Sequence, residues 1–324
     1  MWKQGLAVLA AVAVASTGCG DDDEGQPAGR SGPERATVKV ATIPTAAAAP
    51  LFVGIEEGFF EEEGLKVETQ MAAGGAAIIP AIQSGDMDIG FGNTVSLFVA
   101  REQNLTFKMI AAGQVAPEEE DQDETALMVP ADSEAREPRD LEGATIGVNT
   151  LKNVAELSIS AALDAAGVDP KTIKYTEVPF PEALPTIESG DVQAAFFGEP
   201  FTTLGDKAKA RTILRPFSAG VPGGQIGAYF VSERWLEDNG DVAERFARAM
   251  KRANEHVIEN PDAIRAAVPG FTEVPEDVAK EMRLPVFVPE IDPQALQRLA
   301  DVSARYGLLE EPVDTGELLA QPGS

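Results

Sequence analysis

Apolar positions along the chain fall into two kinds of run, short ones typical of strands and longer ones with helical spacing. Short runs at residues 38–45, 88–93 and 107–112 predict strands. Between them, residues 50–60 and 75–85 carry apolar side chains at helical spacing. Strands that alternate with helices indicate βαβ units and a parallel sheet. The pattern therefore predicts an α/β fold.

The same order of elements occurs twice. Residues 186–198 repeat the pattern of residues 81–93, and their shared Ile-x-Ser-Gly-Asp core places Ser189 105 residues after Ser84. This distance is close to the length of a domain of ~100 residues. It is too long for a solenoid repeat of ~20–50 residues. We therefore expect two similar α/β lobes that face each other across a ligand cleft.

The boundaries of these lobes follow from two predicted crossings. Residues 127–129 form a short apolar strand that carries the chain into the second lobe, and residues 226–231 return it after a glycine-rich turn. The first lobe is then predicted to comprise residues 38–126 and 227–324, and the second lobe residues 127–226. Two crossings permit a hinge closure around a bound molecule.

Composition narrows the possible functions. With 324 residues, the chain is long enough for about two domains of ~100–200 residues each. Its formal net charge is −27 and it has no basic stripe, whereas binding to nucleic acid needs clustered lysine and arginine. We therefore expect no nucleic-acid partner.

The N-terminus has the layout of a bacterial secretion signal. Lys3 precedes an apolar run at residues 6–15, which is too short to span a bilayer because a spanning helix needs ~20 apolar residues. Small residues precede Cys19, the only cysteine, and resemble the lipobox of bacterial lipoproteins; a signal with a chance cysteine is the alternative. We predict a signal peptide over residues 1–18, lipidation of Cys19 and a polar tether over residues 19–37. The folded part is then anchored to the outer face of the cell membrane, or periplasmic.

The inventory of reactive side chains favours binding over catalysis. His256 is the only histidine and lies in a predicted C-terminal helix, and no Gly-x-Ser-x-Gly nucleophile elbow occurs. One histidine and one cysteine exclude a metal site built from clusters of these residues. The acidic run within residues 116–124 lacks the ligand spacing of a calcium loop and is predicted to form an exposed loop. We therefore predict no catalytic residue, no metal and no cofactor.

The candidate ligand site follows from the positions of the strand ends. In open α/β sheets, ligands bind beyond the carboxyl ends of the strands, where loops and helix N-termini meet. Asparagine and threonine also cap helices well, so capping alone is the alternative for the polar residues of the set. For the aromatic residues, including Phe180, stacking on a ring of the ligand competes with core packing. The predicted ligand-binding residues are Thr45, Ala46, Gly74, Gly75, Asn93, Thr94, Asn149, Thr150, Glu199, Phe201 and Tyr229.

Glu199 is the most specific of these candidates. It follows an apolar strand and precedes Pro200, so we expect its side chain to point from the strand end into the cleft. A buried carboxylate without a partner costs several kcal/mol. Its partner is either a lysine or arginine of the protein, in a structural salt bridge, or a cationic or hydrogen-bond-donating group of the ligand.

Four motifs carry a resemblance to a known family. They are GFFEEEGLKV at residues 58–67, QSGDMDIGFG at 83–92, ESGDVQAAF at 188–196 and EPF at 199–201. Together they resemble the solute-binding proteins of ABC importers for aliphatic sulfonates, taurine, nitrate and thiamine-type pyrimidines. The resemblance implies a periplasmic-binding-protein fold of type II, which closes on one small molecule and delivers it to a membrane permease and its ATPase. We expect a monomer.

The ligand class stays open between two chemistries. The candidate loops contain no lysine or arginine, which an oxyanion such as nitrate or a sulfonate favours. If Glu199 lies in the pocket, a bare anion is disfavoured, because like charges ~4 Å apart repel by about 1 kcal/mol even in water. An aminopyrimidine or a taurine-like zwitterion suits the site better. A periplasmic enzyme acting on a small pyrimidine or acid, and a ligand-sensing lipoprotein, are the alternative functions.

Overall fold

The computed structural model describes residues 35–72, 74–311 and 313–320. The predicted signal peptide, Cys19 and most of the predicted tether lie outside the described residues, so these stay predictions. The first strand begins at Ala36, so the last two residues of the predicted tether belong to a strand instead. Within the described ranges, no helix is long and apolar enough to cross a membrane.

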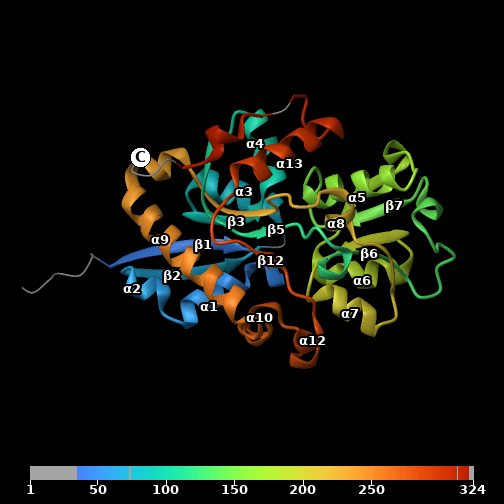
Figure 1. The fold of residues 1–324 in the computed structure, drawn as a ribbon, viewed down its shortest axis with the longest axis horizontal. Helices are drawn as coiled ribbons and strands as arrows, with labels where there is room; N and C mark the ends of the chain where they lie inside the picture. The colour runs from blue at the N-terminus through green and yellow to red at the C-terminus, as the bar shows by residue number, and fades with distance from the viewer. Residues whose placement is uncertain (1–34, 73, 312, 321–324) are drawn as a thin grey trace, which may run out of the picture. The chain divides into compact units, whose positions relative to one another are not determined.

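Two five-stranded mixed sheets organise the fold, and they have the same topology (Figure 1). The first has the order β2-β1-β3-β11-β4 and the second, written in the matching direction, β8-β7-β9-β6-β10. In each sheet the first three strands are parallel, and the last two are antiparallel to their neighbours. The strands are β1 Ala36–Thr42, β2 Leu65–Met71, β3 Ile89–Asn93, β4 Phe107–Ala112, β5 Gln114–Val115, β6 Ala126–Val129, β7 Thr145–Val148, β8 Lys174–Glu177, β9 Ala194–Phe197, β10 Arg211–Leu214, β11 Gly227–Ser232 and β12 Val286–Phe287.

Each sheet thus receives its fourth strand from one of the two predicted crossings. β6 begins where the chain enters the second sheet, and β11 brings it back into the first. This confirms the prediction of two similar α/β units joined by two crossing strands. The exact lobe boundaries at residues 126 and 227 stay predictions.

The repeated Ser-Gly-Asp motif is the end of a helix in both copies. Gly85 and Gly190 have φ of +82° and +81° and cap the preceding helix in the left-handed region, which favours glycine. The serine hydroxyl of each motif donates to the aspartate two residues later, at 2.9 Å after Ser84 and 2.7 Å after Ser189. The chain then enters the central strand of its sheet. The motif is scaffold, and it sets where that strand ends.

Helices surround both sheets (Figure 1). The α-helices are α1 Ala49–Glu56, α2 Phe59–Glu62, α3 Gly75–Ser84, α4 Thr94–Glu102, α5 Val154–Ala165, α6 Phe180–Ser189, α7 Phe201–Lys207, α8 Pro216–Gly220, α9 Glu233–Glu259, α10 Pro261–Ala267, α11 Pro269–Thr272, α12 Glu276–Glu281 and α13 Pro293–Arg305. Short 3-10 helices are η1 Ala46–Ala48, η2 Glu120–Gln122, η3 Pro138–Leu141, η4 Pro170–Thr172 and η5 Thr315–Leu318. The long α9 packs on α1 and β4 with the apolar face that its sequence predicts, including the buried Phe246 and Ala249.

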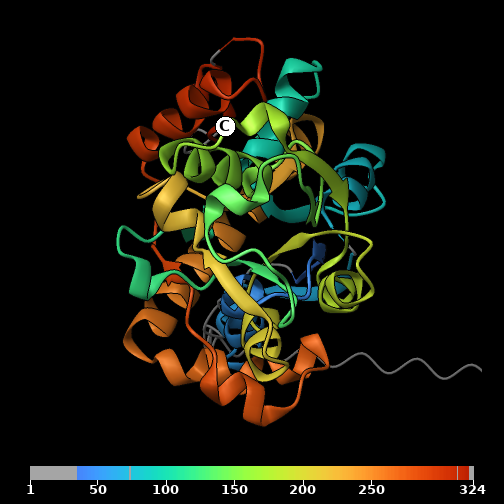
Figure 2. The same cartoon turned by 90° about the vertical axis from the view of Figure 1, so that its right-hand side faces the viewer.

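The C-terminal segment also contacts α7, a helix that follows β9 of the second sheet. α12 packs against α7, and the two helices lie side by side in both views (Figures 1 and 2). Lys207 of α7 forms salt bridges with Asp277 at 3.1 Å and Glu281 at 3.0 Å. β12 then pairs with β5, beside the bridge between Val115 and Gln225. A third segment therefore lies next to the two crossing segments.

Candidate ligand-binding site

A cavity lies between the two sheets, at the carboxyl ends of their parallel strands. Its volume is about 60 Å³. By the same measure one water needs ~10–15 Å³, so there is space for a small molecule. The lining comes from both sheets and from the crossing segments: Ile43, Thr45, Ala47, Gly75, Phe91, Gly92, Asn93, Gln114, Glu124, Thr125, Asn149, Asn153, Val154, Phe180, Phe196, Gly198, Glu199, Phe217, Ile226 and Gly227.

Five of the eleven predicted ligand-binding residues line this cavity. Four of them follow or end a parallel strand, as the strand-end rule requires, and Gly75 begins α3. The five are Thr45, Gly75, Asn93, Asn149 and Glu199. Their role in ligand binding stays a prediction, but the fold brings them together from both sheets.

Four predicted residues lie beside the cavity without lining it. The backbone N–H of Ala46 donates to the carbonyl of Glu199 at 2.8 Å, which joins the two halves of the molecule. The hydroxyl of Thr94 turns away and donates to the carbonyl of Gln225 at 2.5 Å. The hydroxyl of Thr150 donates to a neighbouring carbonyl, and Gly74 packs against the loop that follows β7. These residues shape the backbone around the site.

Two predicted aromatic residues are not among the residues that line the cavity. Phe201 stacks behind Phe180, with ring centroids 6.1 Å apart and planes at 7°, and Phe180 is the ring that lines the cavity. Tyr229 is buried against Phe91 at 4.9 Å. It lies two residues along β11 from the lining residue Gly227, a step of ~7 Å away from the site. We therefore leave Phe201 and Tyr229 out of the proposed site.

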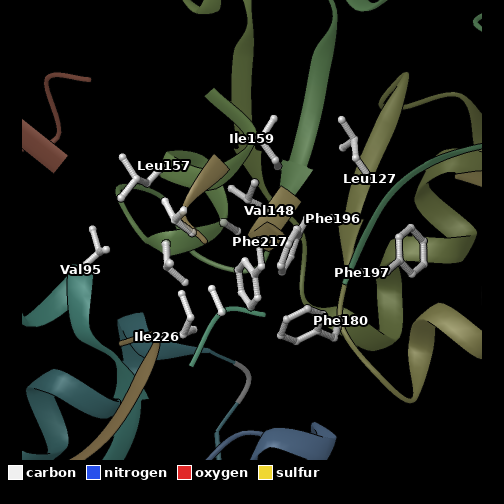
Figure 3. Close-up of a cluster of buried hydrophobic side chains, with 14 of the residues drawn as sticks. Val95, Leu127, Val148, Leu157, Ile159, Phe180, Phe196, Phe197, Phe217 and Ile226 are labelled. Carbon is white, nitrogen blue, oxygen red and sulfur yellow. The ribbon is translucent and has the colours of Figure 1, made fainter. Parts of the chain in front are cut away.

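Aromatic side chains form much of the apolar wall. Phe180, Phe196 and Phe217 come from three elements of the second half, and Figure 3 shows them gathered near Ile226 of the returning crossing segment. Phe196 lies 6.1 Å from Phe180 and 5.6 Å from Phe217 between ring centroids. Phe91 faces the cavity from the first sheet. A flat ring would meet aromatic surface from both halves of the molecule.

Glu199 is buried, with 2% of its surface exposed, and its partners are hydrogen-bond donors of the protein. Its Oε2 accepts from the backbone N–H of Thr203 at 3.0 Å. Its Oε1 accepts from the Thr203 hydroxyl at 2.9 Å and from the backbone N–H of Arg283 at 3.0 Å. No lysine or arginine among the described residues forms a salt bridge with it. Burial raises the pKa of Glu199 to about 7, while these hydrogen bonds act in the opposite direction.

Glu124 is a second buried carboxyl group of the site that sequence reasoning missed. The prediction of an exposed loop over residues 116–124 is correct for residues 118–122 but wrong for Ala116, Pro117, Asp123 and Glu124, which are buried. Asp123 is held by the backbone N–H groups and hydroxyls of Thr125 and Ser218 at 2.6–2.9 Å, which draws the end of the loop inward.

The register of β6 and β9 explains why the two glutamates meet. Ala126 lies opposite Phe197 in this antiparallel pair, so two further steps place Glu124 opposite Glu199. The backbone N–H of Glu199 donates to Oε2 of Glu124 at 3.4 Å. Burial, then Asp123, then Glu199 raise the pKa of Glu124 well above its ordinary value. The sequence contains a corresponding signal. Glu124 lies shortly before β6, and Glu199 lies shortly after β9, the strand that pairs with β6.

Most of the remaining polar groups of the lining either have no hydrogen-bond partner among the described residues or cap a helix. Oε1 of Gln114 and the hydroxyl of Thr45 are buried and have no hydrogen-bond partner within the described part of the chain. Asn93 caps α4 by accepting from the backbone N–H of Ser96 at 2.9 Å, and it also lines the cavity, so its role in ligand binding stays a prediction beside the observed cap. Asn149 is not a cap, because Asn153 caps α5. The lining contains no lysine, arginine or histidine.

No metal centre accompanies these groups. Across residues 35–72, 74–311 and 313–320, no cluster of three or more histidine, cysteine, aspartate or glutamate side chains is arranged to hold a metal ion. His256 is not among the lining residues and packs edge-on against Phe59, with ring centroids 5.7 Å apart.

Comparison with known proteins connects this geometry to binding proteins. The family described as NMT1/THI5 like matches residues 45–264. The chain is 26% identical over 232 residues to the formylaminopyrimidine-binding protein of Halalkalibacterium halodurans, covering 71% of this chain and 68% of that one. It is also 26% identical over 235 residues to the taurine-binding periplasmic protein of Escherichia coli, covering 72% and 68%.

Solved structures show the fold. The alkanesulfonate-binding protein SsuA from Xanthomonas axonopodis pv. citri superimposes with a TM-score of 0.72 at 17% identity, covering 89% of this chain and 99% of that one. The fold is therefore that of periplasmic binding proteins, as the sequence motifs predicted.

Proposed function

The chain belongs to the NMT1/THI5-like family, and from this premise we propose that it is the solute-binding component of an ABC importer. Its named relatives are binding proteins rather than enzymes. The cavity between two similar halves supports capture of one small molecule by closure. We also propose that the protein is exported, is anchored through a lipid on Cys19, acts as a monomer and delivers its ligand to a permease and its ATPase.

We propose an aminopyrimidine-like ligand. The observation that carries this proposal is the polar lining, which has two carboxyl groups and no cationic side chain. A sulfonate or nitrate needs N–H or cationic donors, whereas an amine group donates to carboxylates. The phenylalanine rings supply apolar surface for a flat ring. A taurine-like zwitterion satisfies the carboxylates through its ammonium group but leaves its sulfonate without a cation.

A thermal-shift screen tests the proposed function. The probes are 4-amino-2-methylpyrimidine, taurine, methanesulfonate and nitrate. A ligand at 100 times its Kd adds ~2.7 kcal/mol to the free energy of unfolding, which is easily seen as a rise in Tm. We expect the largest rise with the aminopyrimidine. A larger rise with methanesulfonate or nitrate contradicts the ligand class, and chemical conversion of a bound probe contradicts the assignment as a binding protein.

Gly74→Ala tests whether the halves close as the structure indicates. Gly74 has a φ of −179°, which any residue adopts, but an added Cβ would lie 2.8 Å from the carbonyl oxygen of Asn149 and 2.9 Å from the hydroxyl of Thr150. Both neighbours follow β7, in the other half. The methyl group therefore penalises closure rather than the folding of either sheet.

The expected result is a Kd for the best probe raised about fivefold, which corresponds to ~1 kcal/mol. The free energy of unfolding without ligand should change little. Isothermal titration calorimetry and urea denaturation measure the two quantities. Gly270→Ala is the matched control, because nothing lies within 4 Å of its added Cβ. Equal Kd values for the two variants contradict the closure contact.

A further inference from the structure

Two buried carboxyl groups share the cavity without a cation. Glu124 and Glu199 have exposed fractions of 4% and 2%, and both line the cavity. In the described part of the chain, neither forms a salt bridge with lysine or arginine. Neighbouring carboxyl groups in such surroundings cannot both stay ionised near neutral pH, because burial and mutual repulsion each disfavour the second charge.

The hydrogen bonds identify which group keeps the proton. Glu199 accepts three donors at 2.9–3.0 Å, two of them backbone N–H groups, and donors of this kind stabilise a carboxylate. Glu124 accepts one long hydrogen bond, at 3.4 Å, from the backbone N–H of Glu199. The less stabilised carboxylate takes the proton. Burial acts on the pKa of Glu124 in the same direction.

The surrounding charged groups leave this assignment in place. Arg215 is buried near Glu124, but its Nη1 donates to the carbonyls of Asp123 and Thr125 at 2.8 Å each. The guanidinium of Arg283 donates to two loop carbonyls, the nearer at 2.9 Å. Asp123 raises the pKa of Glu124 and so favours the proton there, whereas Arg215 lowers it as the smallest of the influences on that group. Asp206 raises the pKa of Glu199, but its effect is smaller than that of each of the three hydrogen bonds that lower it.

We propose that Glu124 is the neutral acid and Glu199 the carboxylate of this pair, so that the cavity presents one O–H donor beside one charged acceptor to the edge of a neutral amino-heterocycle. The inference rests on the proposed function and adds the means of recognition. A ring nitrogen beside an amino group is an acceptor next to a donor. The Glu124 hydroxyl then donates to the ring nitrogen, and Glu199 accepts from the amino group.

Two further polar groups of the cavity have no hydrogen-bond partner in the described part of the chain and are available to the same edge of the heterocycle. Oε1 of Gln114 and the hydroxyl of Thr45 line the cavity, are at least nine-tenths buried, and have no partner among the described residues. Each can accept a further N–H of the ligand. A sulfonate has hydrogen-bond acceptors only. The pair of Glu124 and Glu199 offers it a single donor, the Glu124 hydroxyl, beside the negative charge of Glu199, which repels it.

Calorimetric titration with 4-amino-2-methylpyrimidine from pH 6.5 to pH 9 tests the proposal. In the wild-type protein, loss of the Glu124 proton removes the donor, so we expect affinity to fall at least tenfold once the pH exceeds the pKa of Glu124, which burial and Asp123 raise well above its ordinary value. Glutamine keeps an N–H donor at every pH. E124Q should therefore lack this fall and bind at least fivefold more tightly than the wild type above that pKa. E119Q, on an exposed residue of the same loop, should follow the wild type.

A second measurement does not depend on the ligand. The infrared difference spectrum between the ligand-free wild type and E124Q at pH 7 should contain the carbonyl stretch of one protonated carboxyl group. The difference spectrum between the wild type and E119Q should not contain it. This readout reports the proton directly, whatever the protein binds.

The outcomes separate the two proposals. A fall in affinity that persists in E124Q, or an absent infrared band, overturns the assignment of the proton to Glu124. Ionisation of Glu199, whose pKa is about 7, raises affinity at the start of the titration. Wild-type affinity that continues to rise above pH 8, where Glu199 is already ionised, overturns the assignment. If no probe binds a protein that unfolds cooperatively, the proposed ligand class fails, and the infrared band alone then decides whether Glu124 is protonated.

Discussion

Glu199→Gln is expected to weaken binding of the best ligand at least tenfold, which is ~1.4 kcal/mol of binding free energy. The substitution removes the charge of a residue that lines the cavity and leaves the size of the side chain unchanged. A charge-assisted hydrogen bond from an amino group is roughly twice as strong as a neutral one. Loss of the charge therefore lowers affinity more than loss of a hydrogen bond between two neutral groups.

The hydrogen bonds around Glu199 add to the effect. Oε1 and Oε2 each accept a backbone N–H, from Arg283 and Thr203 respectively. A glutamine amide replaces one of these oxygens with an NH₂ group, so in either orientation it places a donor against a backbone donor. The side chain is then expected to rotate away from its position at the cavity, because an unpaired buried donor costs ~1–3 kcal/mol.

Isothermal titration calorimetry with the best ligand of the screen measures this effect. Glu188→Gln is the matched control. It makes the same chemical change as Glu199→Gln, but at an exposed position near the end of α6. We expect the control to keep the wild-type Kd. A Kd of the Glu199 variant within threefold of the wild type, or a best ligand that is a bare anion, contradicts the role of Glu199.

Gly220→Ala is expected to lower the free energy of unfolding by about 3 kcal/mol, at the upper end of the range for overpacked sites. A Cβ at this position would lie 2.1 Å from the carbonyl oxygen of Ser158 and 2.9 Å from its carbonyl carbon. Both are backbone atoms of α5, so no side-chain rotation relieves the overlap. α8 must move away from α5, and Phe217 of the cavity wall moves with it.

Urea denaturation measures this loss of stability. Gly270→Ala is again the control, because its added methyl meets nothing within 4 Å, and alanine is favoured over glycine within a helix by ~0.5–1 kcal/mol. The control should be as stable as the wild type or slightly more stable. A loss below 1 kcal/mol in Gly220→Ala would mean that α8 shifts at little cost.

The fold could be predicted from the sequence because its main features depend on local pattern. The Ser-Gly-Asp motif ends a helix in both copies, and a short apolar strand follows each copy. These features set the strand ends and therefore the edge where a ligand binds. Thr45, Asn93 and Glu199 line the cavity for that reason.

The rest of the site depends on contacts between remote segments. Thr94 follows Asn93 directly, yet its hydroxyl reaches Gln225, 131 residues away, instead of the cavity. Glu124 lies in an acidic loop that looks solvated in the sequence. Its burial depends on Ser218, which holds Asp123 from 95 residues away. Neither contact leaves a periodic pattern in the sequence.

The C-terminal segment changes what opening of the cleft requires. The two crossing segments alone would permit a hinge motion between the halves. Here α12 is bound to α7 through Lys207, and the Arg283 N–H just beyond it is bound to Glu199. This segment must either detach from the second half or travel with it. Opening of the proposed site therefore either breaks the hydrogen bond from the Arg283 N–H to Glu199 or moves the whole C-terminal segment together with the second half.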